Sequence, residues 1–491
     1  MSQYWIVVAI LLPIIGGIAT ALLPFKKEKY MFLFIEGFML VTSAIVWGLL
    51  AGGTTEVFHV VHFVHDLSIS FKIDGLTMVF AGLVSVLWPL ATLYAFEYME
   101  HHDHKKSFFM FYSIAYGVTL GIAFASDMLS MYFFYELLTL STVPLVMHTL
   151  KREAILATRK YLYYSLGGAA FALTGLVFLI VYGNDLEFVL GGSLSPELIG
   201  DKAPLLLWIY LFAFMGFGVK AAIWPLSAWL PQAGVAPTPV TALLHAVAVV
   251  KAGVFAITRL TYYSFGTEFL RGTWVQYVVM GLAMFTMVYG CSRALKETHI
   301  KRRLAFSTVS NLSYIIFGVT IMTPLGLVGA LCHLVCHAVM KICSFMCAGA
   351  FMHQTGKSYI HDMDGVGRKM PIVFGCFTAA ALGLMGVPGL AGFISKWNLA
   401  QAAVDSKNPM AYLGIVCLLI SALLTAIYML SIVMRAFFPS SDFRGDAIAK
   451  VTDPGWKMYV PLIICALGNL ALGLFSQPLV QFFMDIAAGK Y

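Results

Sequence analysis

The sequence predicts an all-α polytopic membrane protein with about fourteen transmembrane helices. Of its 491 residues, 60% are hydrophobic and 11% are charged, and the mean hydropathy is +0.85. A soluble protein could not cover its surface with so few charged residues. The hydrophobic residues form runs of about 20, the length needed to cross a hydrocarbon core of roughly 30 Å. Alternating segments of about ten residues, which indicate a membrane β-barrel, do not occur in the sequence.

Each hydrophobic run is expected to form one span. In chain order the expected spans are 4–23, 30–51, 76–98, 108–126, 128–149, 162–182, 205–222, 238–260, 274–292, 304–322, 326–352, 372–393, 410–434 and 459–483. The longest connections, 182–204 and 436–456, are too short for a second folded domain, so 1–491 is expected to be a single transmembrane domain. The first run lacks a basic leader and precedes a basic loop, so we expect an uncleaved anchor rather than a signal sequence.

Lysine and arginine are distributed unevenly over alternate loops. One set of loops carries about 21 of them, including Lys301, Arg303 and Arg444, and the other set carries about six, including Lys72 and Arg259. Short cytoplasmic loops collect positive residues, so both termini are expected on the non-cytoplasmic side of the cell (inner) membrane. Because topology accounts for the net charge of +7, that charge gives no reason to expect binding to nucleic acid.

Two spans contain helix-breaking residues beside a lysine. The seventh has a proline shortly after Lys220, and the twelfth has a proline and glycines ahead of Lys396. Such residues release backbone groups that need partners or water, and paired interruptions in two halves of a chain indicate a transport site. We therefore expect two inverted five-helix repeats, 108–260 and 274–434, with broken helices 7 and 12. Two half-channels would then open to opposite sides.

Ionisable side chains within the spans indicate a proton pathway. A charge at the centre of a membrane helix costs a few kcal/mol, so such residues usually serve ion or proton transport. Histidine is a suitable relay because its ordinary pKa is near 6.5, and two histidines share one helical face with a lysine at a spacing of four residues. The expected relay residues are Glu136, Lys220, Lys251, Lys341, Lys396, His245, His333 and His337.

Structural alternatives stay open for these residues. Glu136 and Lys220 could form an ion pair that only joins two helices, and Lys251 could donate to a carbonyl freed near a proline. Lys396 could serve structure alone, and His245 could simply pack. A metal site in the segment CHLVCH at 332–337 is disfavoured because adjacent Cys and His side chains point about a hundred degrees apart on a helix.

The remaining polar residues have simpler interpretations. The run HHDH at 101–104 lies among charged neighbours and is expected to be a solvated loop. Asp74 is expected to cap the third span, whereas Glu36 lies inside the second span without an obvious partner. The eight cysteines all lie in the apolar second half and are expected to be free buried thiols. The sequence has no iron–sulfur, dinucleotide or P-loop motif, so no cofactor is expected in this chain.

Six stretches between about 130 and 400 resemble, in order and spacing, the antiporter-like membrane subunits shared by respiratory complex I, membrane-bound hydrogenases and Mrp-type cation/proton antiporters. The matching stretches are FFYELLTLSTVPL around Glu136, GVKAAIWPLSAWLP around Lys220, APTPVTALLHAVAVVKAG with His245 and Lys251, IKRRLAFSTVSNLSY from Ile300, CHLVCHAVMKICSF with His333, His337 and Lys341, and GVPGLAGFISKW with Lys396.

The resemblance implies a division of roles within a proton-translocating subunit. It pairs Glu136 with Lys220, continues a central hydrophilic axis through helices eight and eleven, and ends that axis at Lys396. Burial lowers the pKa of a lysine and a nearby carboxylate raises it, so we expect the distance between Glu136 and Lys220 to decide whether the proton passes to Lys251. Such a two-state element could couple a distant signal to a proton step.

The resemblance also implies partners and alternatives. Other membrane subunits are expected as partners, protons as the transported ion, and the lipid bilayer as surroundings; any redox reaction would belong to other subunits. A sodium/proton antiporter subunit of Mrp type is the alternative function, and a non-conducting structural subunit is a further one. Gln232 and His299 stand where many relatives carry an acidic residue. The short end after the last span and Lys396 make the chain look more like the D-type Mrp subunit or its hydrogenase equivalent.

Overall fold

The computed structural model describes residues 3–63, 67–439 and 450–491, which are almost entirely helical. Within these residues, 13 helices are long and apolar enough to cross a membrane. The number is 14 if the segment Ile360–Arg368 and the following helix Pro371–Met385, bent by 115°, are counted as one span. The expected polytopic α-helical fold is therefore confirmed.

The elements follow one another in the order that the hydrophobic runs predict. The first half contains α1 (Tyr4–Leu22), α2 (Glu28–Ala51), β1 (Phe58–His62), β2 (Ser68–Phe71), α3 (Gly75–Tyr98), α4 (Lys105–Phe124), α5 (Met128–Val146), α6 (Arg152–Tyr182), α7 (Pro196–Ile199), η1 (Gly200–Lys202), α8 (Ala203–Lys220) and α9 (Leu230–Ala233). The second half contains α10 (Thr238–Ala246), α11 (Val249–Thr258), η2 (Arg259–Phe265), α12 (Thr267–Leu270), α13 (Trp274–Lys296), α14 (Ile300–Ile321), α15 (Pro324–Thr355), η3 (Ile360–Met363), η4 (Val366–Arg368), α16 (Pro371–Met385), α17 (Ala391–Asp405), α18 (Pro409–Phe437), α19 (Trp456–Leu474) and α20 (Ser476–Ala487).

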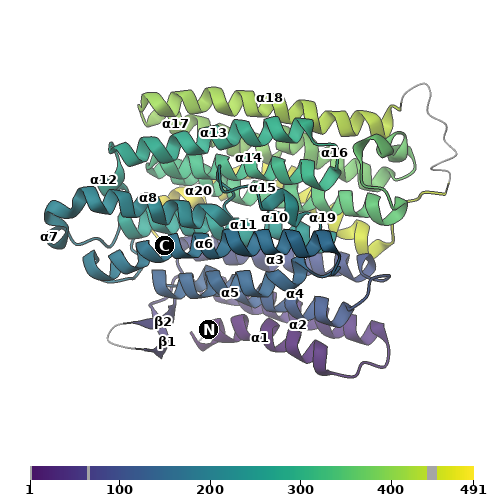
Figure 1. The fold of residues 1–491 in the computed structure, drawn as a ribbon, viewed down its shortest axis with the longest axis horizontal. Helices are drawn as coiled ribbons and strands as arrows, with labels where there is room; N and C mark the ends of the chain where they lie inside the picture. The colour runs from purple at the N-terminus through teal and green to yellow at the C-terminus, as the bar shows by residue number, and fades with distance from the viewer. Residues whose placement is uncertain (1–2, 64–66, 440–449) are drawn as a thin grey trace.

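The helices form one bundle whose centre holds α10, α11, α14 and α15. Figure 1 shows the spans lying side by side along one direction, with α1 and α2 at one edge and α18 at the opposite edge. The span Thr238–Phe265 is buried over its whole length and Ile300–Ile321 over nearly all of it, whereas only a third of α2, α18 and α19 is buried. Charged side chains on the central helices are therefore shielded from lipid by other helices.

The two ends of the bundle differ. The hairpin β1–β2, α7 and α12 lie at the same end as both chain termini (Figure 1), and we call this the hairpin end. The opposite end carries the connections 23–27, 99–104 and 147–151, and we call it the basic end. The two termini were expected to share one side, and their common position at the hairpin end agrees with that expectation.

Both helix breaks that the prolines and glycines indicated are present. α8 ends at Lys220, after which the chain turns until α9, and α16 ends at Met385, with five residues between it and Ala391, which begins α17. A third break, between α10 and α11 at Val247 and Ala248, was not expected. Neither residue is glycine or proline, so the sequence carries no local signal of this break.

Three basic residues that were expected in loops lie inside the protein. Arg259 is fully buried because the helical path continues through η2, and Lys301 and Arg303 are 4% and 8% exposed because α14 begins before them. Each has an internal acceptor that replaces water: Asp74 for Arg259, and backbone carbonyls for the other two. Charges near the ends of apolar runs were assigned to loops, so sequence reasoning missed such paired charges. Arg444, in the expected connection 436–456, lies outside the described residues.

Two local details differ from the expected spans. A short antiparallel hairpin of β1 and β2, with Phe58 opposite Phe71, lies in the connection between α2 and α3. β2 is buried and β1 is mostly exposed, so neither strand alternates between buried and exposed residues. The sequence therefore gives only a weak signal for these strands. The last expected span, 459–483, is divided into α19 and α20 at Phe475.

Candidate functional site

Glu136 of α5 and Lys220 of α8 face each other. The Lys220 Nζ atom lies 3.7 Å from Glu136 Oε1 and 3.4 Å from the centre of the Tyr135 ring, and it donates to the Tyr135 carbonyl. The Lys220 side chain is 1% exposed and that of Glu136 is 23% exposed. Glu136 Oε1 has no hydrogen-bond partner among the described residues. The two charges are thus close, but no other residue holds this oxygen in place.

A close backbone contact brings Lys220 beside α11. The end of α8 packs on Gly253, where an added Cβ would lie 2.7 Å from the Lys220 carbonyl carbon and closer still to the Ala221 nitrogen. Only glycine leaves room for backbone at this distance. Because Lys251 precedes Gly253 by two residues, this contact places Lys220 and Lys251 on touching elements.

Substituting Gly253 with alanine is expected to separate α8 from α11. Overpacking of this kind costs about 1–3 kcal/mol, and the separation would lengthen the path between Lys220 and Lys251. Thermal unfolding of the purified complex and its rate of proton uptake check this prediction together. Gly167→Ala in α6 is the matched control, since a Cβ there meets nothing within 4 Å. A native melting temperature and a native rate for Gly253→Ala would contradict the expected effect.

A ladder of buried polar contacts crosses the centre of the bundle from α11 to α17. Lys251 Nζ lies 3.0 Å from His337 Nδ1 of α15. The ring of His333, one turn earlier on α15, lies 5.8 Å from that of His337, and its Nδ1 is 2.9 Å from Ser395 Oγ of α17. The lysine and both histidines are fully buried. The Nε2 atom of each histidine has no partner among the described residues, so each ring can still bind or release a proton there.

Lys396 lies at the far end of this ladder. Its Nζ donates to the carbonyls of Leu384 and Met385 at 2.8 and 2.9 Å, which are the carbonyls that the end of α16 leaves free. The same nitrogen lies 5.4 Å from the centre of the Tyr314 ring, and Tyr314 stacks on His333 at 4.9 Å. The break in the twelfth span therefore holds Lys396, and one aromatic ring separates it from the ladder.

Lys341 and His245 lie beside the ladder rather than within it. Lys341, one turn after His337 on α15, donates to Ser307 Oγ at 2.7 Å, and Tyr428 also donates to that oxygen at 2.7 Å. His245 of α10 stacks on Phe345, one turn after Lys341, at 4.7 Å. Both nitrogens of the His245 ring are buried without a hydrogen-bond partner among the described residues. All eight residues expected from the sequence thus lie on six elements of the bundle, although only some of them touch.

The chemistry of the set is that of proton exchange. It combines carboxylate, ammonium and imidazole groups, which bind and release protons, with hydroxyls that can pass them on. Within the part of the chain that the structure describes, no three His, Cys, Asp or Glu side chains are arranged to hold a metal ion.

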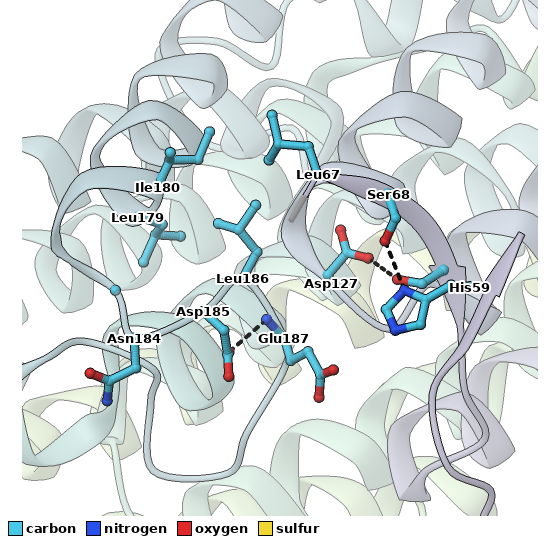
Figure 2. A pocket seen from close by; sticks show the side chains of 12 residues that line it. His59, Leu67, Ser68, Asp127, Leu179, Ile180, Asn184, Asp185, Leu186 and Glu187 are labelled. Atoms are coloured by element: carbon cyan, nitrogen blue, oxygen red, sulfur yellow. Dashed lines mark hydrogen bonds between the residues drawn. The ribbon is translucent and has the colours of Figure 1, made fainter. Parts of the chain in front are cut away.

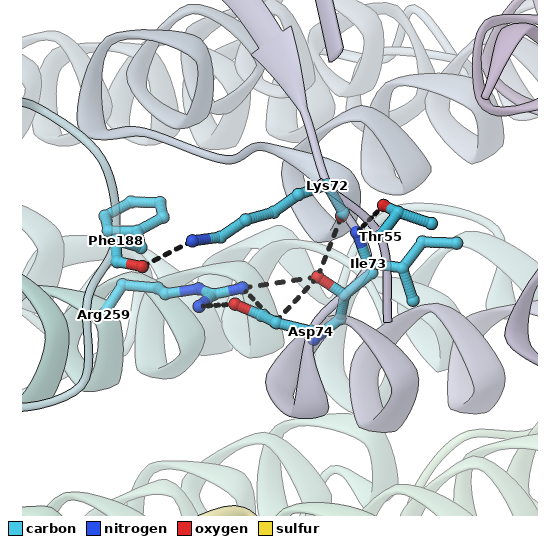
Figure 3. Close-up of polar contacts among 7 residues, drawn as sticks. Thr55, Lys72, Ile73, Asp74, Phe188 and Arg259 are labelled. Atoms are coloured by element: carbon cyan, nitrogen blue, oxygen red, sulfur yellow. Dashed lines mark hydrogen bonds and ion pairs between the residues drawn. The ribbon is translucent and has the colours of Figure 1, made fainter. Parts of the chain in front are cut away.

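Sequence reasoning missed a buried ion pair at the hairpin end (Figure 3). The two terminal nitrogens of Arg259 donate to the Asp74 carboxylate at 2.5 and 2.8 Å, and three aromatic rings lie within 5.2 Å of the guanidinium. Asp74 also accepts from the Thr77 N–H at 2.9 Å, which confirms the expected helix cap. Burial raises the pKa of the Asp74 carboxyl, but the charge and hydrogen bonds of Arg259, together with the Lys72 charge and the Thr77 N–H, outweigh burial and the pKa is lowered. The two residues are 185 positions apart, so no local pattern relates them.

Lys72 extends the charged group toward the surface of the hairpin end. Its Nζ donates to the Phe188 carbonyl at 2.5 Å (Figure 3). Burial, followed by the Arg259 charge, lowers the pKa of Lys72, while Asp74 and Glu187 oppose this shift. The group therefore contains two cations and one buried carboxylate.

A cavity of about 400 Å³ opens beside this group (Figure 2). Asp127, which caps α5, lies in its wall and accepts from Ser130 N and Oγ, both at 2.7 Å. Burial raises the pKa of Asp127, and these hydrogen bonds offset the shift only in part. The other lining residues are His59, Leu67, Ser68, Ser70, Leu179, Ile180, Gly183, Asn184, Asp185, Leu186 and Glu187. The cavity thus reaches the first turn of the helix that carries Glu136.

Comparison with known proteins gives consistent matches. A family model described as NADH:quinone oxidoreductase/Mrp antiporter, TM matches residues 125–425, and one described as NADH-Ubiquinone oxidoreductase (complex I), chain 5 N-terminus matches residues 62–109. The F(420)H(2) dehydrogenase subunit L of Methanosarcina mazei is 30% identical over 97% of this chain and 75% of its own length. The NADH-quinone oxidoreductase subunit N of Desulforudis audaxviator is 29% identical over 85% of this chain and 84% of its own. A chain in the structure of the Mrp complex from Dietzia sp. has the same fold, with a TM-score of 0.83 and 21% identity over 99% of this chain and 98% of that one.

Proposed function

Because the chain belongs to the NADH:quinone oxidoreductase/Mrp antiporter family of membrane subunits, we propose that it translocates protons as one subunit of a larger membrane complex. The observation that carries this proposal is the ladder from Lys251 through His337 and His333 to Lys396. A subunit that only filled space in the membrane would gain nothing from four lysines within its spans, because each one costs insertion energy. We place the complex in the cell membrane, with both termini of this chain on the non-cytoplasmic side.

The contacts support a stepwise path. While Glu136 stays near Lys220, the carboxylate stabilises the ammonium form; when Glu136 moves away or is neutralised, the ammonium becomes the less favoured form in these surroundings. Lys220 would then pass its proton to Lys251, which is brought near by the contact at Gly253. From Lys251 the proton would move to His337, His333 and finally the amine of Lys396.

The two helix breaks suit the two ends of such a path. Lys220 lies at the end of α8, and Lys396 faces the end of α16. The backbone groups that these helix ends leave without partners favour hydration. We propose that 108–260 and 274–434 are inverted repeats, and that each contributes one half-channel. No cofactor is assigned to this chain, and we assign any redox reaction of the complex to other subunits.

Proton and sodium uptake into inverted membrane vesicles that contain the whole complex tests the proposal. Lys251→Met is expected to abolish proton uptake, because the substitution removes the link between the lysine pair and His337. Lys296→Met, an exposed lysine at the end of α13, is the control and is expected to leave uptake unchanged.

A protonophore separates the two candidate ions. If this chain conducts protons, any sodium uptake follows the proton gradient and disappears with the protonophore. Sodium uptake that survives the protonophore but is lost in Lys251→Met would instead favour a sodium path in this chain. Native proton uptake by assembled Lys251→Met would refute the proposed path.

A further inference from the structure

An apolar groove lies on the flank of the bundle, apart from the ladder and from the cavity at the hairpin end. It has a volume of about 590 Å³, and its walls belong to α2, α3, α15, α19 and α20. None of the lining residues is charged, and Trp47 of α2 is the only one whose side chain contains nitrogen or oxygen. Trp47 and Val86 in its walls are 50% and 44% exposed, so the groove is open to the surroundings of the bundle. We call it the flank groove.

The flank groove covers only the half of the bundle nearer the hairpin end. On α2 it is lined within the last five residues of the helix, and on α3 between Met78 and Leu87. α15 begins with Pro324 at the hairpin end, and the lining residue farthest along this helix is Val339. At 1.5 Å per residue, Val339 lies about 22 Å from the start of α15. A bilayer with its headgroups is about 40–45 Å thick, so the groove has the depth of one leaflet.

The floor of the groove is the central helix α15. Every residue of this helix between Gly326 and Phe351 is buried except Val335 and Val339, and both of these line the groove. Each lies two positions after a histidine of the ladder, His333 or His337. Side chains two positions apart on a helix point about 200° apart. The groove therefore reaches the back of the helix that carries the ladder.

Gly82 of α3 leaves space in the wall of the groove. A Cβ at this position would lie 3.5 Å from Leu50 Cδ1 and 3.8 Å from the Trp47 ring. These are ordinary van der Waals distances. A larger side chain at this position would therefore extend into the groove without displacing the backbone.

The groove is too small for a membrane-spanning helix. A helix with its side chains is about 10 Å across, so the 590 Å³ of the groove would hold only about five of its residues. A spanning helix has about 20 residues and would need a groove across both leaflets. A hydrocarbon chain of a lipid is thinner, carries no polar group that needs a partner, and ends near the middle of the bilayer.

We propose that one hydrocarbon chain of a membrane phospholipid occupies the flank groove, with its headgroup at the hairpin end and its tip against Val335 and Val339. Two aromatic side chains stand at the expected level of the headgroup, where tryptophan and tyrosine are enriched. One is Trp47, and the other is Tyr491, whose ring lies 5.2 Å from that of Phe482 in the groove wall. The bound chain completes the packing of α15 behind the ladder. This lipid site does not depend on the proposed proton path.

Photolabelling of the whole complex tests the site. The complex is delipidated in detergent and reconstituted into vesicles of phosphatidylglycerol that carries a diazirine near the end of one acyl chain, and mass spectrometry locates the labelled residues. We expect label at Val335 or Val339, the two residues of α15 that the groove exposes. An assembled native complex without label at either residue would overturn the proposal.

Filling the groove separates a bound lipid from general contact with the membrane. Gly82→Phe is expected to abolish labelling of Val335 and Val339 while the complex still assembles. Gly167→Phe is the matched control and is expected to keep native labelling, because an added Cβ at this position of α6 meets nothing within 4 Å.

Val86→Trp, at the exposed edge of the groove, narrows it from another position if Gly82→Phe fails to assemble. Native labelling of α15 in either assembled variant would show that the label does not arrive through the groove and would overturn the proposal.

A photoreactive residue in the groove identifies the occupant directly. A diazirine analogue of leucine in place of Val335 is expected to form an adduct with phospholipid in native membranes. An adduct with a peptide of another subunit would assign the groove to a neighbouring protein and overturn the lipid site. Adducts confined to other residues of this chain would show that the groove is closed in the complex, which would also overturn it.

Discussion

Replacing Lys220 with alanine is expected to abolish coupled proton movement while the complex still assembles. The change removes the ammonium group that connects Glu136 to Lys251. Assembly is expected to survive because the Glu136 side chain is 23% exposed, so removal of Lys220 leaves no fully buried charge without a partner. Glu136→Ala should have the same effect, and Lys396→Ala nearly the same, because Lys396 ends the ladder.

Proton uptake into inverted vesicles, normalised to the amount of assembled complex, measures this effect. Lys202→Ala is a matched control, since Lys202 also lies near a carboxylate, Asp201 at 3.4 Å, but is 49% exposed at the hairpin end. Uptake at the native rate in an assembled Lys220→Ala or Glu136→Ala complex would show that the pair only joins α5 to α8.

Replacing Arg259 with methionine is expected to impair assembly, which Lys220→Ala leaves intact, through a large loss of stability. Arg259 is fully buried and the Asp74 side chain is 11% exposed, so removal of the arginine leaves a carboxylate without its partner. Breaking a buried pair in this way costs about 3–5 kcal/mol. The expected result is a lower melting temperature in detergent and less assembled complex in the membrane.

A double-mutant cycle with Asp74→Asn checks the physical cause. Asparagine still caps α3, because its side-chain oxygen accepts from the Thr77 N–H, so this variant removes the charge alone. The double variant Asp74→Asn, Arg259→Met is expected to be more stable than Arg259→Met, because no uncompensated charge remains. Equal losses in the single and double variants would indicate that the aromatic packing around Arg259, rather than its charge, supports the hairpin end.

The contrast between these two ion pairs follows from exposure. Glu136 and Lys220 are 3.7 Å apart with one oxygen free of other partners, whereas Arg259 and Asp74 form two short hydrogen bonds inside a ring of aromatic side chains. The geometry of Glu136 and Lys220 suits a pair that forms and separates, whereas that of Arg259 and Asp74 suits a permanent structural contact. Sequence reasoning recognised only the first, because it counted Arg259 among the loop residues and Asp74 as a helix cap.

The helix breaks also show which features sequence reasoning can predict and which it misses. Those after Lys220 and before Lys396 were predictable, since proline and glycine act on their own helix regardless of its neighbours. The break at Val247 and Ala248 has no such residue, and the chain there is determined by its neighbours in the bundle. The arrangement of 108–260 and 274–434 as inverted repeats stays a prediction.

Sequence alone determined the membrane class, the approximate spans and the eight ionisable residues worth placing, because hydropathy and the cost of a buried charge act residue by residue. Tertiary structure decided which of them touch. The contact of Lys251 with His337, the pairing of Asp74 with Arg259, and the hydrogen bond of Lys301 to the Ala236 carbonyl all join segments that are far apart along the chain. Such contacts depend on how helices pack against one another, and packing leaves no periodic trace in any single span.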